Sequence, residues 1–113
     1  MHELAITQSV VDAVTERTGS APVASVRVRV GRLAGVVPDA MRFCFELVTA
    51  GTPLEGATLE FDQPEGRGRC RACGEDVALA DLILLCGCGS ADVEVLAGRE
   101  LAVASVVLAG PAG

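Results

Sequence analysis

Residues 70–88 read CRACGEDVALADLILLCGC and place four cysteines in the spacing C-x2-C-x12-C-x-C. Four thiolates suit the tetrahedral coordination of zinc or another thiophilic metal, and a closed site of this kind is structural. The segment holds too few apolar residues for an independent core, so a bound metal would supply much of its folding free energy. The candidate ligands are Cys70, Cys73, Cys86 and Cys88.

Two other interpretations of these cysteines stay open. The first pair could be a redox-active C-x2-C dithiol, although no thioredoxin-like βαβ pattern precedes Cys70, and the thiols could also be buried without any ligand. The second pair is one residue shorter than the common C-x2-C turn, and Gly87 between its thiols allows the tighter geometry. The neighbouring arginines either offset the thiolate charge or are simply solvated; they are Arg67, Arg69 and Arg71.

Outside this segment, the hydrophobic pattern predicts two helices and three strands. Residues 4–17 and the stretch from Pro38 to about residue 50 have helical periodicity, and residues 24–31 and 57–62 alternate as half-buried strands do. Residues 101–108 are apolar on both faces, which predicts a central strand. Cys44 lies in the apolar stripe of the second helix, where we expect a core cysteine.

The simplest architecture for this order of elements is an α+β fold. Two helices would pack on a three-stranded mixed sheet, and a small zinc-ribbon-like domain would be inserted between strands. We expect the first domain to span residues 1–64 plus 93–113, and the inserted zinc-binding domain to span residues 65–92.

Composition excludes several classes of function. The 113 residues carry a net charge of −6, and every cation other than the single histidine is an arginine. An acidic surface repels phosphate backbones, so we expect no nucleic-acid partner. The absence of lysine excludes a P-loop. No apolar run reaches the ~20 residues of a membrane span, and the chain opens without a signal-peptide pattern, so we expect a cytoplasmic protein with no membrane partner.

The first three residues form a candidate metal site. The Met1 amine, the His2 backbone nitrogen and the His2 imidazole Nδ1 can chelate one ion through a five-membered and a six-membered ring, and the Glu3 carboxylate can fill a further position. Nitrogen-rich square-planar or tetragonal sets are those that Ni(II) and Cu(II) favour. Protons compete with the metal for these nitrogens near neutral pH, so we expect a site suited to delivery rather than storage. The plain alternative is an ordinary helix start.

Several short segments, in the same order along the chain, resemble the HypA/HybF family of nickel-insertion proteins of [NiFe]-hydrogenase maturation. The resemblance covers essentially the whole chain. It departs from the family pattern at the second cysteine pair, where the family usually shows C-P-x-C and this chain has Cys86-Gly87-Cys88. The segments are MHEL (1–4), VVPDA (36–40) with Phe43, Phe45 and Glu46, GTPLEGA (51–57), the cysteine pairs followed by Gly89-Ser90, and GREL (98–101).

The resemblance implies a non-catalytic nickel metallochaperone with an N-terminal nickel site at Met1, His2 and Glu3. It also implies a zinc site at the four clustered cysteines, so that the metals are Ni(2+) and Zn(2+). The implied partners are a HypB-type GTPase and the [NiFe]-hydrogenase large-subunit precursor, and in some members urease accessory proteins. We expect a monomer or a weak homodimer. The rival hypotheses are a zinc-ribbon protein-interaction module without nickel delivery and a dithiol oxidoreductase.

Overall fold

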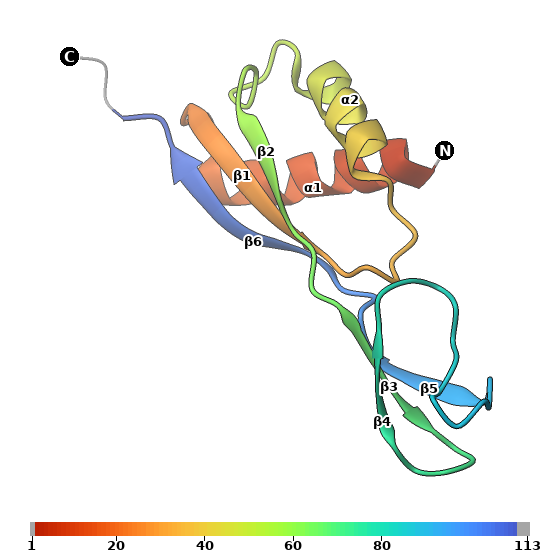
Figure 1. Cartoon of the computed structure of the whole chain (residues 1–113). Helices are drawn as coiled ribbons and strands as arrows, with labels where there is room; N and C mark the ends of the chain where they lie inside the picture. Colours follow the sequence, from red (N-terminus) through yellow and green to blue (C-terminus); the bar gives the residue numbers. More distant parts are fainter. Residues whose placement is uncertain (1, 111–113) are drawn as a thin grey trace. The chain divides into compact units, whose positions relative to one another are not determined.

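The computed structural model describes residues 2–110 of the chain, and the side chains of residues 3–110. Two helices and two three-stranded sheets make up a mixed α+β fold (Figure 1). The α+β class and the two helices are as predicted, whereas only one three-stranded sheet is expected from the sequence. The elements are α1 (His2–Thr18), β1 (Val23–Val30), α2 (Pro38–Thr49), β2 (Thr58–Asp62), β3 (Gly66–Cys70), β4 (Asp76–Leu79), β5 (Val93–Ala97) and β6 (Leu101–Leu108).

The helices begin and end where backbone chemistry predicts. Pro38 occupies the start of α2, where its missing N–H costs no helical hydrogen bond. Helix α1 ends at Gly19, which adopts a φ of 60° and donates its N–H to the Thr15 carbonyl at 2.8 Å. A glycine in this left-handed conformation is a common helix terminator.

The chain divides into two compact units, and the first contains both helices. It holds α1, α2, residues 58–61 of β2, residues 23–28 of β1 and residues 102–108 of β6. The strand order is β2-β1-β6, and the alternating valines Val26 and Val28 of central β1 are fully buried. Helix α1 adds Val10 and Val14 to the buried set. The core of this unit therefore follows the period-2 pattern of β1 and the helical periodicity of α1.

The expectation of a central strand at residues 101–108 is wrong. Within the described residues β6 lies at the edge of its sheet, with β1 between it and β2 (Figure 1). Val107 and Leu108 are 55% and 51% exposed. A run that is apolar on both faces is typical of a strand that is buried on both faces of its sheet. Such a run does not indicate whether the strand pairs with other strands on one side or on both.

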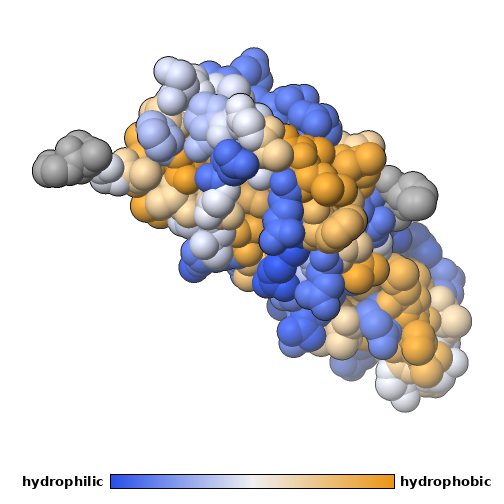
Figure 2. Space-filling view, turned by 90° about the horizontal axis from the view of Figure 1, so that it is seen from above, coloured by the Kyte–Doolittle hydropathy of each residue, from blue (hydrophilic) through white to orange (hydrophobic). Residues whose placement is uncertain are grey.

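Two large apolar side chains of α2 are exposed among charged ones. Met41 and Phe45 are buried, whereas Phe43 and Leu47 are 63% and 59% exposed. Leu47 is therefore not buried with Met41 and Phe45, although it lies in the same apolar-rich helix. Figure 2, in which the molecule is seen from above, shows hydrophobic surface interspersed with hydrophilic side chains.

The second unit contains the cysteines and spans residues 29–35 and 62–101. Its sheet has the order β4-β3-β5, with antiparallel pairing on both sides of β3. The unit is larger than the expected insert at 65–92, because β5 pairs with β3 and Leu33 is buried in the same core. The buried residues of this core are Leu33, Cys70, Leu79, Cys86 and Val93.

Close packing around β3 explains two of its glycines. A Cβ on Gly68 would lie 2.7 Å from Val93 Cγ1 and 2.8 Å from the Glu94 carbonyl oxygen, which is closer than atoms can approach. Gly66 lies against the side chain of Leu33 in a similarly tight contact. Glycine at these positions lets neighbouring segments approach the backbone of β3.

Candidate metal centre

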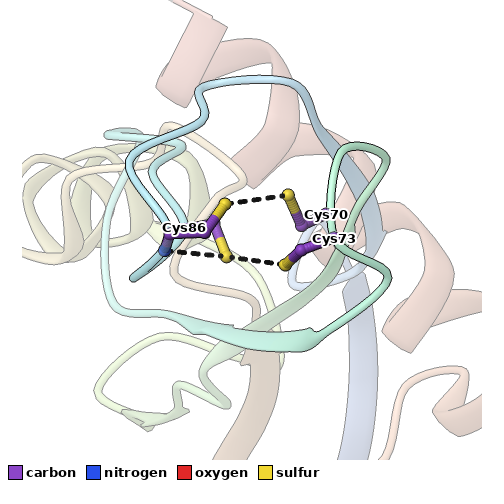
Figure 3. Close-up of side chains that lie close together, drawn as sticks. Cys70, Cys73 and Cys86 are labelled. Carbon is purple, nitrogen blue, oxygen red and sulfur yellow. Dashed lines mark hydrogen bonds between the residues drawn. The ribbon is translucent and has the colours of Figure 1, made fainter.

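The structure brings the four predicted cysteines together at one end of the second unit. Their Sγ atoms all lie within 4.8 Å of one another (Figure 3). Cys70 ends β3 and Cys73 follows in the next turn, while Cys86 and Cys88 lie in the loop that precedes β5. Two strands and two turns therefore position the thiols.

The sulfur separations match those of a tetrahedral metal site. The Sγ atoms of Cys70 and Cys88 are 3.7 Å apart, and those of Cys73 and Cys86 are 3.6 Å apart. With metal–sulfur bonds of about 2.3 Å, tetrahedral ligands are separated by about 3.8 Å. A disulfide would require about 2.05 Å, and all four cysteines are free. The donor set fits Zn²⁺, and the four thiolates would hold it in a closed site without an open coordination position.

Each cysteine pair lies in a turn that is closed by backbone hydrogen bonds. In the first turn, Cys70 N–H donates to the Glu75 carbonyl at 2.9 Å and Gly74 N–H donates to the Cys70 carbonyl at 2.8 Å. In the second, Cys86 N–H donates to the Ser90 carbonyl and Gly89 N–H donates to the Cys86 carbonyl, both at 2.9 Å. The second turn thus repeats the first with one residue fewer.

The shorter turn therefore still presents both of its sulfurs to the cluster. Gly74 and Gly89 have φ values of 79° and 96°, a conformation that side chains rarely adopt. The Cys88 N–H also points to the Cys86 Sγ at 3.5 Å, a contact that stabilises a thiolate. The unusual Cys86-Gly87-Cys88 spacing is compatible with a four-sulfur site.

Crowding of the thiols separates their pKa values. The backbone N–H of Cys73 stabilises the Cys70 thiolate and lowers its pKa to about 6 against the opposing effect of burial. The Glu75 N–H lowers the pKa of Cys73, but burial and the neighbouring sulfurs outweigh it and raise that pKa to about 12. The pKa of Cys88 is raised as well, because the sulfurs of Cys86 and Cys70 outweigh the Ser90 N–H. The lowered pKa favours a thiolate at Cys70, and a bound cation would favour the thiolates of Cys73 and Cys88 as well.

Two of the arginines beside the first pair are engaged with acidic side chains. Arg71 Nη1 donates to Asp92 Oδ1 at 2.8 Å, and Nη2 lies 3.7 Å from Glu94 Oε2. These contacts, led by the Asp92 hydrogen bond, raise the pKa of Arg71. Arg69 lies 3.6 Å from Asp76 across the β3–β4 pair. These ion pairs of Arg69 and Arg71 link β3, and the turn that follows it, to neighbouring segments. The sequence does not predict them, because no local pattern marks an ion pair between distant residues.

The predicted nickel ligands are only partly described. Met1 lies outside the described residues, and so does the side chain of His2, whose backbone begins α1. Glu3 is described: its Oε2 accepts a hydrogen bond from the Val37 N–H at 3.4 Å. Val37 is the N-cap residue of α2 and has no side-chain cap. Sequence reasoning missed this contact between the starts of the two helices. Cys44, in α2, is half-buried and separate from the cluster.

Comparison with known proteins identifies the family. The family model described as "Hydrogenase/urease nickel incorporation, metallochaperone, hypA" matches residues 1–108. The hydrogenase maturation factor HypA of Nostoc punctiforme is 44% identical over 106 residues, which is 94% of each chain. HypA of Geotalea uraniireducens is 46% identical over 104 residues, 91% of this chain and 94% of the relative.

Solved structures share the fold. The solution structure of the Ni metallochaperone HypA from Helicobacter pylori superposes with a TM-score of 0.63 at 18% identity, covering 96% of this chain and 97% of the other. Neither described helix is long and apolar enough to cross a bilayer. The chain belongs to the HypA family of nickel metallochaperones in hydrogenase maturation, and is a maturation factor rather than an enzyme.

Proposed function

We propose that this chain carries Ni(II) on Met1, His2 and Glu3 and delivers it to the [NiFe]-hydrogenase large-subunit precursor. The family match supports this role, and it includes the N-terminal residues. The observation that carries the proposal is the position of Glu3, whose carboxylate lies at the start of α2 next to the chain end. A carboxylate offers several acceptor lone pairs, so Glu3 would add an oxygen donor to the nitrogen ligands of the proposed site.

The chemistry of the proposed ligands suits transfer. The Met1 amine, the His2 backbone nitrogen and His2 Nδ1 would form fused chelate rings of the kind that square-planar Ni(II) favours. Free α-amines and imidazoles in general have pKa values near ~8 and ~6.5, so proton competition would weaken metal binding as the pH falls. A carrier needs such adjustable affinity to release its cargo.

The cysteine cluster supplies the structural half of the proposal. Cys70, Cys73, Cys86 and Cys88 would hold Zn(2+), and the ion would neutralise the thiolates that otherwise repel one another. In this proposal nickel binds to the α+β domain, in which both helices pack on a mixed β2-β1-β6 sheet. Zinc binds to the inserted domain. The site offers no catalytic constellation, so GTP hydrolysis would belong to a HypB-type partner in the cytoplasm. Urease accessory proteins would be further partners, as in some members of the family.

An interaction module without nickel delivery is the second candidate. Its supporting observation is the loop before Cys86, where Leu82 and Ile83 are 62% and 71% exposed. Exposed aliphatic side chains on a zinc-bound turn suit docking to another protein. The two candidates differ in one measurable property, nickel binding by the untagged chain.

The test is a calorimetric titration of Ni²⁺ into tag-free, zinc-loaded protein. His2→Ala, and a variant with one extra residue before Met1, should each weaken nickel binding by at least about tenfold. Gln8→Ala, an exposed change further along α1, is the matched control and should bind as the parent does. Equal binding by all four proteins would exclude the N-terminal site, and no binding by the parent would favour the interaction module.

A further inference from the structure

Two close sulfur–sulfur contacts connect the two turns of the cysteine cluster (Figure 3). Cys70 Sγ lies 3.7 Å from Cys88 Sγ, and Cys73 Sγ lies 3.6 Å from Cys86 Sγ. A disulfide joins sulfurs that are about 2.05 Å apart, so each sulfur would have to move by about 0.8 Å to form one. Small movements of the side chains would therefore bring each pair of sulfurs to bonding distance.

Each of these contacts joins one exposed cysteine to one buried cysteine. Cys73 and Cys88 are exposed, whereas Cys70 and Cys86 are buried. A hollow of about 480 Å³ lies beside the cluster, and its lining includes both exposed cysteines. A small oxidant can therefore reach one sulfur of each contact, while the second sulfur lies next to it and away from solvent. Oxidation-sensitive sites commonly have this arrangement, in which an accessible cysteine lies beside a second cysteine that resolves it.

Disulfides within the turns are less favourable in this chain. Cys86 and Cys88 are separated by Gly87 alone, and a backbone hydrogen bond of 2.9 Å to the Cys86 carbonyl closes their turn. A disulfide across one residue would have to distort this turn, and distorted disulfides store strain and are easily reduced. A bond between Cys70 and Cys73 would leave the second pair with only each other as partners. The short second turn therefore favours two bonds between the turns.

We propose that the cluster is a peroxide-sensitive zinc switch, in which oxidation joins Cys70 to Cys88 and Cys73 to Cys86 and releases the ion. The inference rests on the zinc site of the proposed function. Because disulfide sulfurs are no longer thiolate ligands, the oxidised cluster could not hold zinc. Reduction by a dithiol would return four thiols and allow zinc to bind again.

The oxidation balances with hydrogen peroxide as the oxidant. The exposed thiolate attacks one peroxide oxygen, which gives a sulfenic acid and releases hydroxide. The buried thiolate then attacks the sulfenic sulfur, so that the S–S bond forms and a second hydroxide leaves. Two such reactions convert four thiolates, two molecules of peroxide and four protons into two disulfides and four molecules of water.

The proposed pairing predicts that the second unit stays folded after oxidation. Both disulfides would connect the turn after β3 to the loop before β5, which are the segments that a bound ion would connect. Cys70 and Cys86 belong to the buried core of this unit, so bonds at these residues would hold core segments together. Such cross-links also restrict the unfolded chain. The oxidised form would therefore be a second ordered state of the unit.

The test treats tag-free, zinc-loaded protein with about two equivalents of hydrogen peroxide per chain. Zinc content should fall from about one ion per chain towards none, and dithiothreitol followed by added zinc should restore it. Cys44→Ser removes the one cysteine outside the cluster, is the matched control and should respond as the parent does. Zinc that stays bound during peroxide treatment would overturn the switch alone. A protein that binds no zinc before oxidation would overturn the proposed zinc site as well.

Peptide mapping under non-reducing conditions identifies the bonds. Cleavage after Arg71 separates the cysteines of the first turn, and cleavage before Asp76 and Asp81 separates that turn from the second. Bonds between the turns should yield one species of three joined peptides, and fragmentation between Cys86 and Cys88 should then identify the partner of each. Bonds within the turns, the opposite pairing between the turns, or sulfinic and sulfonic acids in place of disulfides would each overturn the proposal.

Amide hydrogen exchange distinguishes the oxidised state from simple loss of zinc. Peroxide-treated protein should protect β3 and β5 more strongly than protein from which a chelator has removed the zinc, because only the oxidised form is cross-linked. Equal exchange in the two forms would show that the disulfides do not replace the ion, and would overturn the switch. None of these measurements involves nickel, so their outcomes are independent of the proposed carrier role.

Discussion

The Glu3 carboxylate accepts a hydrogen bond from the backbone N–H of Val37, with 3.4 Å between Oε2 and N. The contact joins the first turn of α1 to the residue that precedes α2. Because α2 lacks a side-chain cap of its own, Glu3 supplies an acceptor for an N–H at its start, where negative charge is also favourable. In the proposed carrier Glu3 would also be a nickel ligand, and substitutions can separate this role from its hydrogen bond to Val37.

Glu3→Gln should lower nickel affinity while leaving the start of α2 intact. The amide oxygen of glutamine still accepts from Val37, but the carboxylate that would bind the metal is gone. Glu3→Ala should lower nickel affinity equally and also reduce the melting temperature by a small amount. Calorimetry and thermal denaturation measure the two effects. Equal nickel binding by Glu3→Gln and the parent would remove Glu3 from the ligand set.

Cys70→Ser should release zinc, so that metal content falls from about one ion per chain towards none. The second unit should then lose its ordered core, since Cys70 and Cys86 are part of it. Helical circular dichroism should persist, because both helices belong to the first unit. Cys44→Ser, in α2 and outside the cluster, is the control and should keep its zinc. Global unfolding of Cys70→Ser would argue against two units of separate stability.

Removal of zinc by a chelator should raise amide hydrogen exchange in β3, β4 and β5 and leave exchange in β1 nearly unchanged. The metal replaces repulsion among thiolates with attraction, so its binding free energy stabilises the unit that holds the cysteines. Mass spectrometry of exchanged peptides, with and without added zinc, measures the difference. Uniform protection in both states would mean that the cysteine unit folds without a metal.

Gly68→Ala should destabilise the second unit by about 1–3 kcal/mol, because the added methyl group would overlap Val93 and the Glu94 carbonyl. Gly87→Ala is the matched control: a Cβ at Gly87 meets no atom within 4 Å. Urea denaturation of the zinc-loaded proteins compares the two. Loss of zinc from Gly87→Ala alone would show instead that the short second turn requires glycine.

Local patterns in the sequence predicted the helices, β1 and the grouping of the cysteines. The alternation at residues 24–31 predicts that one face of a strand is buried, and the paired cysteines predict a shared metal site. Both predictions rest on residues that are close together in the sequence. The edge position of β6 depends on which strands pair, and periodicity carries no such information. The burial of Leu33 beside Cys70 likewise joins distant segments. The Glu3–Val37 hydrogen bond also joins distant segments, and so no local pattern predicts it.

The burial of Leu33 has a practical consequence for dissecting this protein. Leu33 N–H donates to the Gly98 carbonyl at 2.7 Å, and Arg32 N–H donates to the Pro64 carbonyl at 3.1 Å. Backbone hydrogen bonds therefore hold residues 29–35 in the unit that contains the cysteines. A fragment cut from residues 65–92 alone would lack this strip and would also lose β5. To exchange the cysteine unit between homologues, residues 29–35 and 62–101 would have to be replaced together. A chimaera that replaces only one of these two segments should fail to fold.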